Sequence, residues 1–419
     1  MAQTTNTQKN IVVIGGGFAG LQFVQHINTS EFSVLLIDKL NHHQFQPLFY
    51  QVATSQLEPS SISFPFRKIF QYKKNVQIRM AEVLEVDPAA KTVITDIGNF
   101  EYDFLVIASG CKTNFYGNDE VKKNALTLKT IYDAITIRNK ILENFETVLS
   151  VPENEKESLL NIVIAGAGPT GIELAGSFAE IKKNILPKDY PGIDFTRLNI
   201  ILIEGSKFPL NSMSTTAQTA SRKYLDQLGV KLLTEVFVKN YNGEEVLLSN
   251  GQIIKTKNLI WTAGVTGNII KGLASEIITR GRFNVNRVNL VNGYSNIYAI
   301  GDIALMQTPK YPSGHPQVAN VAINQAKNLA ANFSAMLKEK PLNAFEYSDL
   351  GSMATIGKHK AVVDFPFIRL KGHLAWFIWM SLHLMLILSV KNKLIIFINW
   401  SWNYFTKDTS LRLILKKNN

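Results

Sequence analysis

The sequence predicts an α/β protein with two Rossmann-like dinucleotide-binding domains, arranged as in glutathione reductase, and a C-terminal helical segment. Two observations predict the paired domains: a glycine-rich turn follows a buried strand at residues 15–20, and a second one does so at residues 166–171. A third observation, an apolar and basic tail after residue 373, predicts the C-terminal segment.

The first glycine turn belongs to a β-α-β unit. Apolar residues 11–14 precede Gly15-x-Gly17-x-x-Gly20, a helical pattern follows, and the strand "FSVLLIDK" ends at Asp38. Gly15 suits the tight turn, Gly17 lets a pyrophosphate approach the backbone, and Gly20 lets the helix pack closely on the strand. Asp38, about 20 residues further on, is placed to accept a hydrogen bond from a ribose hydroxyl.

The second glycine turn repeats this design. Residues 161–165 lead into Gly166-x-Gly168-x-x-Gly171, and the strand "LNIILIEG" carries Glu204 at its end, after an inserted loop. A carboxylate at this place accepts a hydrogen bond from a ribose 2′-hydroxyl and repels a 2′-phosphate. Glu204 therefore favours NADH over NADPH, although Lys207 lies three residues later.

The repeat extends beyond the fingerprints. "AEVLEV" at residue 81 is matched by "TEVFVK" at 234, and "DFLVIASG" at 103 by "NLIWTAG" at 258. Turn signals at Asn242-Gly243 and Asn250-Gly251 indicate a strand meander. We expect an FAD-binding domain in two parts, residues 1–112 and 266–338, with an NADH-binding domain inserted at residues 113–265. A C-terminal region for dimer and membrane contacts follows at residues 339–419.

Composition limits the chemistry. The 419 residues include one cysteine, Cys111, so the chain cannot form an internal disulfide or a redox-active cysteine pair. Electrons therefore have to leave to an external acceptor: a quinone, oxygen or another protein. The N-terminus lacks the apolar stretch of a signal peptide, from which we expect a cytosolic body.

The C-terminal tail is apolar and basic. The run "LAWFIWMSLHLMLILSV" (374–390) would reach roughly 26 Å as a helix, short of the ~30 Å hydrocarbon core of a bilayer. From Lys391 onward there are six Lys or Arg and one Asp, which is net +5 of the total +11. Such a segment suits the membrane interface and anionic lipid, and not nucleic acid. A buried dimer interface or a core helix is the alternative, and both can hold together.

Two adjacent dinucleotide sites suggest a tightly held flavin and an exchangeable nicotinamide. The order of motifs, with "NHHQFQPLFYQVA" (41–53), "ASG" (108–110), "TAG" (262–264) and the apolar tail, resembles type II NADH dehydrogenase over nearly the whole chain. The resemblance implies an FAD-containing NADH:quinone oxidoreductase that does not pump protons. It further implies a homodimer on the cytoplasmic face of the cell membrane that uses menaquinone or ubiquinone.

The resemblance also assigns residues. It places NADH on Gly166, Gly168, Gly171, Glu204 and Gly264. It places FAD on Gly15, Gly16, Gly17, Gly20, Asp38, Lys39, Val83, Ser109, Gly110, Gly301, Asp302, Ala319 and Asn320. It puts the Glu173 carboxylate near the flavin and the nicotinamide, where we expect it to handle protons or to shape the pocket; stabilising its own helix N-terminus is the alternative.

The quinone slot departs from the family pattern. Where the family has AQxAxQ, this chain has "ANVAIN" (319–324), so that Asn320 and Asn324 replace both glutamines, with Gln325 next in line. The amide chemistry is kept with one methylene fewer. A second departure is Trp379, where some members carry a lysine near the flavin.

Two other functions stay open: a soluble NADH-dependent reductase of a protein acceptor, and a redox sensor that binds NADH without turnover. The histidines show no metal-ligand spacing, so no metal site is expected. His43 either serves the flavin domain or packs. We expect His315 to be solvated in its loop, and His383 to be packed or interfacial.

Overall fold

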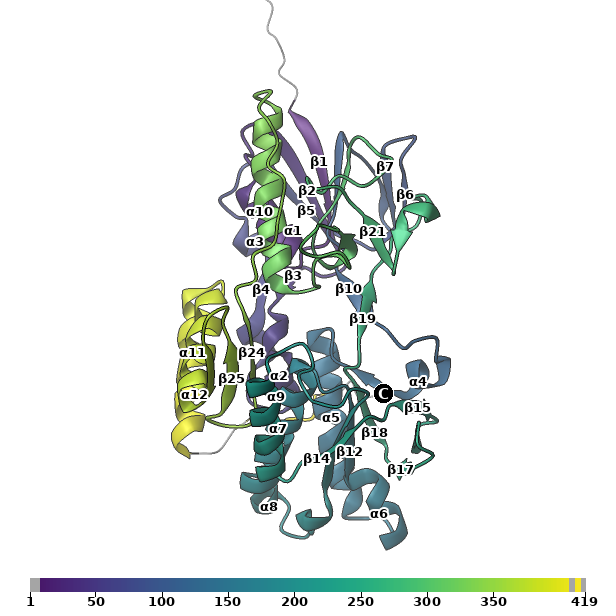
Figure 1. Ribbon diagram of the computed structural model, residues 1–419, viewed down its shortest axis with the longest axis vertical. Helices are drawn as coiled ribbons and strands as arrows, with labels where there is room; N and C mark the ends of the chain where they lie inside the picture. The colour runs from purple at the N-terminus through teal and green to yellow at the C-terminus, as the bar shows by residue number, and fades with distance from the viewer. Residues whose placement is uncertain (1–7, 407–410, 416–419) are drawn as a thin grey trace, which may run out of the picture. The chain divides into compact units, whose positions relative to one another are not determined.

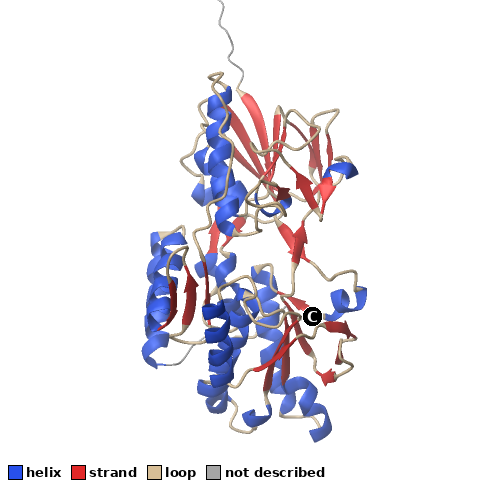
Figure 2. Cartoon of the chain, in the orientation of Figure 1, coloured by secondary structure: helices blue, strands red, loops and turns tan. Residues whose placement is uncertain are grey.

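The computed structural model describes residues 8–406 and 411–415, and the chain forms two compact units (Figure 1). The first unit comprises the residues up to 43, 64–112 and 265–349; the second comprises 44–63, 113–264 and the residues from 350 on. Both are α/β, as the sequence predicts (Figure 2). Because these units are defined by packing, the four-part division of the chain by function remains a prediction.

The first unit is built on a five-stranded parallel sheet in the order β22-β9-β1-β2-β5. Its central strand β1 (Lys9–Ile14) runs into α1 (Phe18–His26), which packs against α10 (Ala319–Met336). The apolar residues of β1 and β2 are buried, as expected for central strands of a parallel sheet covered on both faces, whereas Met80 on the edge strand β5 is exposed. The other strands of the sheet are β2 (Phe32–Asp38), β5 (Val76–Met80), β9 (Phe104–Ile107) and β22 (Ile297–Ala299).

A meander covers the other side of this core. Strands β6 (Val83–Asp87), β7 (Thr92–Thr95) and β8 (Gly98–Glu101) pair antiparallel, and buried residues from sheet and meander share one apolar cluster. The unit also contains α3 (Phe66–Ile69) and a small sheet of β20 (Ile278–Thr279), β21 (Arg282–Asn284) and β23 (Ala304–Leu305). The short strands β3 (His42–Gln44), β4 (Ser63–Pro65), β10 (Cys111–Thr113) and β19 (Val265–Gly267) lie where the chain passes from one unit to the other.

The second unit repeats the plan. Its five-stranded parallel sheet has the order β11-β18-β12-β13-β14, and its meander comprises β15 (Val238–Tyr241), β16 (Glu245–Leu248) and β17 (Ile253–Lys255). The turns between the meander strands fall at the two Asn-Gly pairs that the sequence marks. The sheet strands are β11 (Leu126–Thr127), β12 (Asn161–Ala165), β13 (Asn199–Glu204), β14 (Lys231–Thr234) and β18 (Asn258–Trp261).

The duplication extends to irregularities. Each meander shifts register after its first residue, at Val83 in one unit and at Val238 in the other. The predicted internal repeat is therefore confirmed down to a local bulge. Before its C-terminal segment, the second unit contains the α-helices α2 (Phe49–Ala53), α4 (Asp119–Asn124), α5 (Ile131–Val148), α6 (Glu153–Leu160), α7 (Pro169–Asn184), α8 (Leu186–Asp189) and α9 (Thr215–Gln227).

The C-terminal segment packs within the second unit. A three-stranded antiparallel sheet, β24 (Ser352–Thr355), β25 (Ala361–Asp364) and β26 (Arg369–Gly372), is followed by α11 (His373–Leu386) and α12 (Val390–Thr406). The buried residues Trp379 and Trp400 anchor the two helices, while many of their other large apolar side chains are exposed. Within residues 8–406 and 411–415, the helices all fall short of the length and apolarity needed to cross a membrane.

The close approach of helix to strand at each glycine turn gives a first prediction. A Cβ on Gly171 would lie 1.9 Å from the Gly166 carbonyl oxygen. Gly171→Ala should therefore lower the free energy of unfolding by about 2 kcal/mol or more and weaken NADH binding. Urea denaturation and NADH titration measure the two effects.

Gly205→Ala is the control, because a Cβ there meets no atom within 4 Å. Equal stability of the two variants would contradict the proposed packing constraint.

Candidate functional site: two glycine turns and a buried carboxyl

The first glycine turn is a close-packed cradle. Gly15 has φ +97°, and a Cβ on it would lie 2.4 Å from the Ala108 carbonyl oxygen; a Cβ on Gly20 would lie 1.8 Å from the Gly15 oxygen. Gly17, at the N-cap of α1, has no atom within 4 Å of such a Cβ. The turn is thus filled on its protein side and open where a pyrophosphate would lie, which fits the ADP half of FAD.

Two side chains hold this turn. The Gly16 N–H donates to Asp38 Oδ2 at 2.6 Å, and burial raises the pKa of Asp38 despite that bond. His43 is 2% exposed, and its Nδ1 donates to the Gly16 oxygen at 3.0 Å. Burial lowers the pKa of His43 to about 4, so the ring is neutral. Of the two roles open to His43, the structure shows packing and support of the turn.

The second glycine turn has the same construction. A Cβ on Gly166 would lie 2.7 Å from the Ala263 Cα, whereas Gly168, at the N-cap of α7, is open. Glu204 Oε2 accepts from the Ala167 N–H at 2.8 Å, as Asp38 accepts from Gly16, the equivalent residue of the first turn. Glu204 Oε1 accepts from the N–H and hydroxyl of Ser206. These contacts fit a nicotinamide dinucleotide with an unphosphorylated 2′-hydroxyl.

Gly301 and Asp302 begin a loop that is firmly held. The Gly301 N–H donates to Gln325 Oε1 at 2.8 Å, and the Cys111 thiol donates to Asp302 Oδ2 at 2.9 Å. Gln325 is fully buried. Its amide oxygen supports the Gly301 backbone, whereas its Nε2 is buried without a hydrogen-bond partner among the described residues. Its expected place next in line in the quinone slot therefore stays a prediction.

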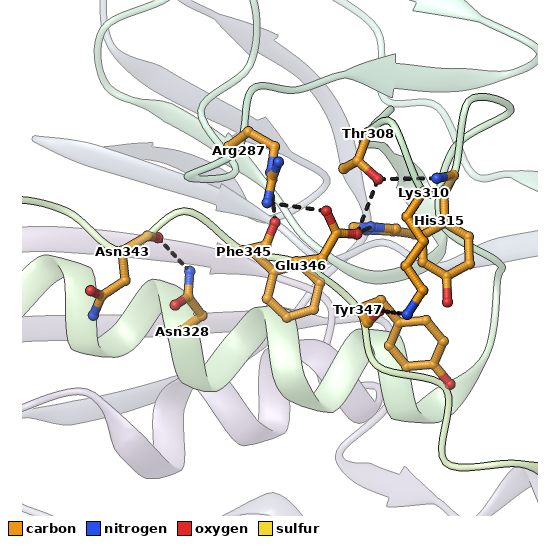
Figure 3. A network of polar contacts seen from close by, with 10 residues as sticks. Arg287, Thr308, Lys310, His315, Asn328, Asn343, Phe345, Glu346 and Tyr347 are labelled. Carbon is orange, nitrogen blue, oxygen red and sulfur yellow. Dashed lines mark hydrogen bonds and ion pairs between the residues drawn. The ribbon is translucent and has the colours of Figure 1, made fainter. Parts of the chain in front are cut away.

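Glu346 holds the far part of the same loop (Figure 3). It accepts from the Thr308 hydroxyl at 3.0 Å and from His315 Nε2 at 3.3 Å, and it pairs with Arg287 at 3.2 Å. The expectation of a solvated His315 is wrong: the residue is 1% exposed. The segment 342–347 packs over it and excludes water, and burial lowers the pKa of this histidine.

The N-terminal turns of α10 carry the predicted quinone residues. Ala319, Asn320 and Asn324 are half-buried, and Asn320 and Asn324 are four residues apart on one helix face. Neither asparagine hydrogen-bonds to another described residue, so their amides stay available to a ligand. They lie in the first unit, with Gly15–Gly20, Asp38, Val83, Ser109, Gly110 and Asp302.

Glu173 lies in the second unit with the second glycine turn. It is 8% exposed, and its Oε1 accepts from the Thr355 N–H at 3.3 Å. Burial raises the pKa of Glu173 to about 8, although the Thr355 bond and the nearby Trp379 indole act the other way. The Trp379 Nε1 is itself buried without a hydrogen-bond partner among the described residues. The carboxyl is therefore protonated at neutral pH.

A series of hydrogen-bonded side chains connects Thr355, the partner of Glu173, to the C-terminal helix α12. The Trp400 indole donates to Gln51 Oε1 at 2.8 Å, and Gln51 Nε2 donates to the Tyr50 hydroxyl at 2.9 Å. The Tyr50 hydroxyl lies 3.1 Å from Thr355 Oγ1. Burial and the Glu173 charge both raise the pKa of Tyr50, which stays neutral. The motif "QPLFYQVA" signals Tyr50 and Gln51, whereas nothing in the sequence signals Thr355.

These side chains border a pocket with about 690 Å³ of space outside the protein atoms, counting solvent at its mouth. Its wall is aromatic on the side of the C-terminal helices, where Trp376, Trp379, Trp400 and Tyr404 lie. The opposite side comes from the second half of α7. Within the described ranges no cluster of His, Cys, Asp and Glu could hold a metal ion.

Comparison with known families identifies the class. Residues 9–326 match the pyridine nucleotide-disulphide oxidoreductases, flavoproteins with two dinucleotide-binding folds. Residues 350–407 match the NDH2 C-terminal domain. The chain is 31% identical over 413 residues to the type II NADH:quinone oxidoreductase Ndh of Mycobacterium tuberculosis, an alignment covering 94% of this chain and 88% of that protein. The chain belongs to the type II NADH:quinone oxidoreductases, and FAD, NADH and a quinone are its cofactor and substrates.

Other relatives agree. The type II NADH:quinone oxidoreductase of Staphylococcus aureus is 27% identical, with 85% of this chain and 89% of that protein covered. The fold matches that of NDH2 from Plasmodium falciparum, solved in complex with NADH, with a TM-score of 0.90, 22% identity and coverage of 98% and 100%. The sulfide:quinone oxidoreductase of Aquifex aeolicus has the same fold at a TM-score of 0.73, with 21% identity and 96% of each chain covered.

The buried carboxyl gives a second prediction. The pKa of Glu173 is raised from 4.5 to about 8, so the folded protein holds a proton that the unfolded chain releases above pH 4.5. Stability is full below pH 4.5 and falls as pH rises through 8. Between pH 4.5 and 7 the loss should be about 3 kcal/mol, and Glu173→Gln should remove it. Urea denaturation at several pH values measures the difference between the two proteins.

Glu157→Gln on α6 is the control, because Glu157 is exposed. If wild type and Glu173→Gln keep the same stability difference at all pH values, Glu173 is not protonated in the folded protein.

Proposed function

We propose that the chain is a non-proton-pumping NADH:quinone oxidoreductase bound to the cytoplasmic face of a membrane, with the predicted residues in the roles given below. One observation carries the proposal: the fold duplicates a dinucleotide cradle, yet its single cysteine is engaged with Asp302. Electrons therefore leave to an acceptor from outside the chain. When bound, NADH and FAD supply hydride transfer and two-electron reduction of the quinone.

The glycine turns bind and orient the coenzymes. Gly17 and Gly168 offer backbone N–H groups at helix N-termini to the pyrophosphates, and Asp38 and Glu204 accept from the ribose hydroxyls. Gly301 and Asp302 hold the ribityl chain, with Cys111 and Gln325 fixing their geometry. The remaining assigned residues, Gly15, Gly16, Gly20, Lys39, Val83, Ser109, Gly110, Gly166, Gly171, Gly264 and Ala319, supply the close approach and the backbone contacts.

Glu173 handles the proton. Its Oε1 accepts from Thr355, so the proton it holds at neutral pH lies on Oε2. A carboxyl with a pKa of about 8 can give up this proton and take it back near neutral pH, as reduction of a quinone to a quinol requires. Tyr50 and Gln51 keep the surroundings of the carboxyl ordered.

Asn320 and Asn324 bind the quinone head group. Their amides can donate to the two quinone carbonyls, and they reach one methylene less far than glutamine.

The quinone residues give a third prediction. In anaerobic stopped flow, NADH should bleach the flavin, and a menaquinone analogue should restore its colour. In Asn320→Ala with Asn324→Ala, bleaching should keep its rate, whereas reoxidation by the quinone should slow about tenfold or more, because two hydrogen bonds are lost. Asn328→Ala is the control, since this amide lies one turn further along α10 and already donates to the Asn343 oxygen.

A flavin that NADH leaves oxidised would favour a redox sensor. If the quinone reoxidised the flavin of the double variant at the wild-type rate, Asn320 and Asn324 would not bind the quinone.

The C-terminal helices bind the membrane in this proposal. Along α12, the apolar residues Leu394 (58% exposed), Ile398 (61%), Trp402 (65%) and Phe405 (80%) form an exposed stripe. Exposed apolar residues of α11, including Leu374, Phe377 and Met385, extend the surface. With Trp, Tyr and Lys at its edges, it suits the interface of an anionic bilayer. We also assign the homodimer contact to this C-terminal region.

This stripe gives a fourth prediction. Ile398→Glu with Trp402→Glu should weaken binding to phosphatidylglycerol vesicles about a hundredfold, because the lost burial is worth about 1.5–3 kcal/mol per side chain. The FAD content and the NADH:ferricyanide activity should persist. Vesicle sedimentation measures the binding.

Tyr132→Glu with Leu149→Glu provides the matched control, since these residues are also large, apolar and exposed but lie on or next to α5. Equal loss of binding in both double variants would show that charge, not the stripe, governs attachment.

A further inference from the structure

A second pocket of the second unit is lined by one face of α5 and by Phe178 and Ile181 of α7. About 380 Å³ of space lies outside the protein atoms when open solvent at the mouth is counted, but the enclosed part has room for only about one small polar group. The helix α5 contributes four residues at spacings of three and four, which place them on one side of the helix: Arg138, Ile141, Leu142 and Phe145. The part of the wall that α5 supplies is thus apolar apart from Arg138.

Arg138 carries a buried charge, and no carboxylate of the described residues forms an ion pair with it. The residue is 2% exposed, and its Nε and Nη2 atoms are buried without a hydrogen-bond partner among residues 8–406 and 411–415. Burial lowers the pKa of Arg138, and the charge of Glu58 opposes this. A guanidinium stays protonated in proteins, and an unpaired buried charge costs several kcal/mol. An oxyanion placed against these two nitrogens would remove that cost.

A second donor lies in the same pocket. Ser55 is 3% exposed, lines the pocket, and its hydroxyl makes no hydrogen bond to another described residue. It follows the C-cap residue of α2, Thr54, and its backbone has the left-handed conformation with φ 57°. A guanidinium and a hydroxyl in one apolar pocket form the donor set of an oxyanion site.

The C-terminal segment reaches the same pocket. Arg412 lines it while pairing with Asp189, so Asp189 offsets the Arg412 charge. The Leu415 N–H donates to Asn139 Oδ1 at 3.1 Å, and Asn139 Nδ2 donates to the Leu415 oxygen at 2.6 Å. The residue next to Arg138 on α5 thus holds residues 411–415 in place, and Arg138 is left as the charge that needs a partner.

We propose that this pocket binds the head group of an anionic amphiphile, a carboxylate or phosphate carried on an apolar chain. Arg138 and Ser55 bind the oxyanion, and the Ile, Leu and Phe side chains of α5 and α7 contact the chain. A small hydrated anion lacks the apolar part that this wall favours, and an uncharged chain lacks the group that Arg138 requires. The site is independent of NADH and quinone chemistry.

The test uses FAD-loaded protein without NADH, and decanoate as the probe. Isothermal titration calorimetry should show saturable binding of decanoate, with decanol and acetate each binding about tenfold more weakly or not at all. Arg138→Met should weaken decanoate binding about tenfold or more, and Arg138→Lys, which keeps the charge, should weaken it less. Without ligand, Arg138→Met should raise the melting temperature, because it removes an unpaired buried charge.

Lys140→Met on the same helix is the matched control and should bind decanoate as wild type does. Phosphatidylglycerol vesicles that displace decanoate from wild type identify a membrane phospholipid as the source, and vesicles that do not displace it identify a free fatty acid. The proposal is overturned if decanoate shows no saturable binding, if Arg138→Met binds it as wild type does, or if acetate binds as tightly as decanoate. In those cases water alone satisfies Arg138.

Discussion

The structure depends on one close contact that it makes twice. In each unit the helix after the glycine turn approaches the first glycine of the turn so closely that a single Cβ would overlap a carbonyl oxygen, at Gly20 in one unit and at Gly171 in the other. This contact aims the N-terminus of α1 or α7 along the open side of the turn. The carboxylates of Asp38 and Glu204 then hold the turn from the end of the neighbouring strand. The proposed phosphate and ribose contacts and the position of Glu173 near the start of α7 all depend on it.

Much of this was predictable, because local chemistry dictates it. Glycines at fixed spacing after a buried strand have few structural alternatives, and a pattern that occurs twice is stronger than either copy alone. The two sheets, the meanders with their Asn-Gly turns and helix α10 all follow from such short-range patterns. The single cysteine likewise excluded disulfide chemistry by counting alone.

What escaped prediction depends on long-range burial. Nothing near His315 in the sequence indicates that residues 342–347 cover it, or that Glu346 pairs with it. Nothing near Gln325 in the sequence indicates that its amide oxygen accepts from the Gly301 N–H. Thr355 meets Glu173 across 182 residues of sequence. The register and direction of a side chain on its element decide such cases, and neither can be inferred from residue type.

Two buried ionisable groups in the second unit show how burial leads to function in different ways. Glu173 can lose its charge at neutral pH by holding a proton, so burial converts it into a group that exchanges protons near pH 8. Arg138 has no such route, since a guanidinium keeps its charge. Burial therefore favours a neutral, protonated carboxyl at Glu173, whereas at Arg138 it leaves a charge that an anion would stabilise. Helix α7 carries Glu173 near its start and lines the Arg138 pocket with its middle, so one helix serves both.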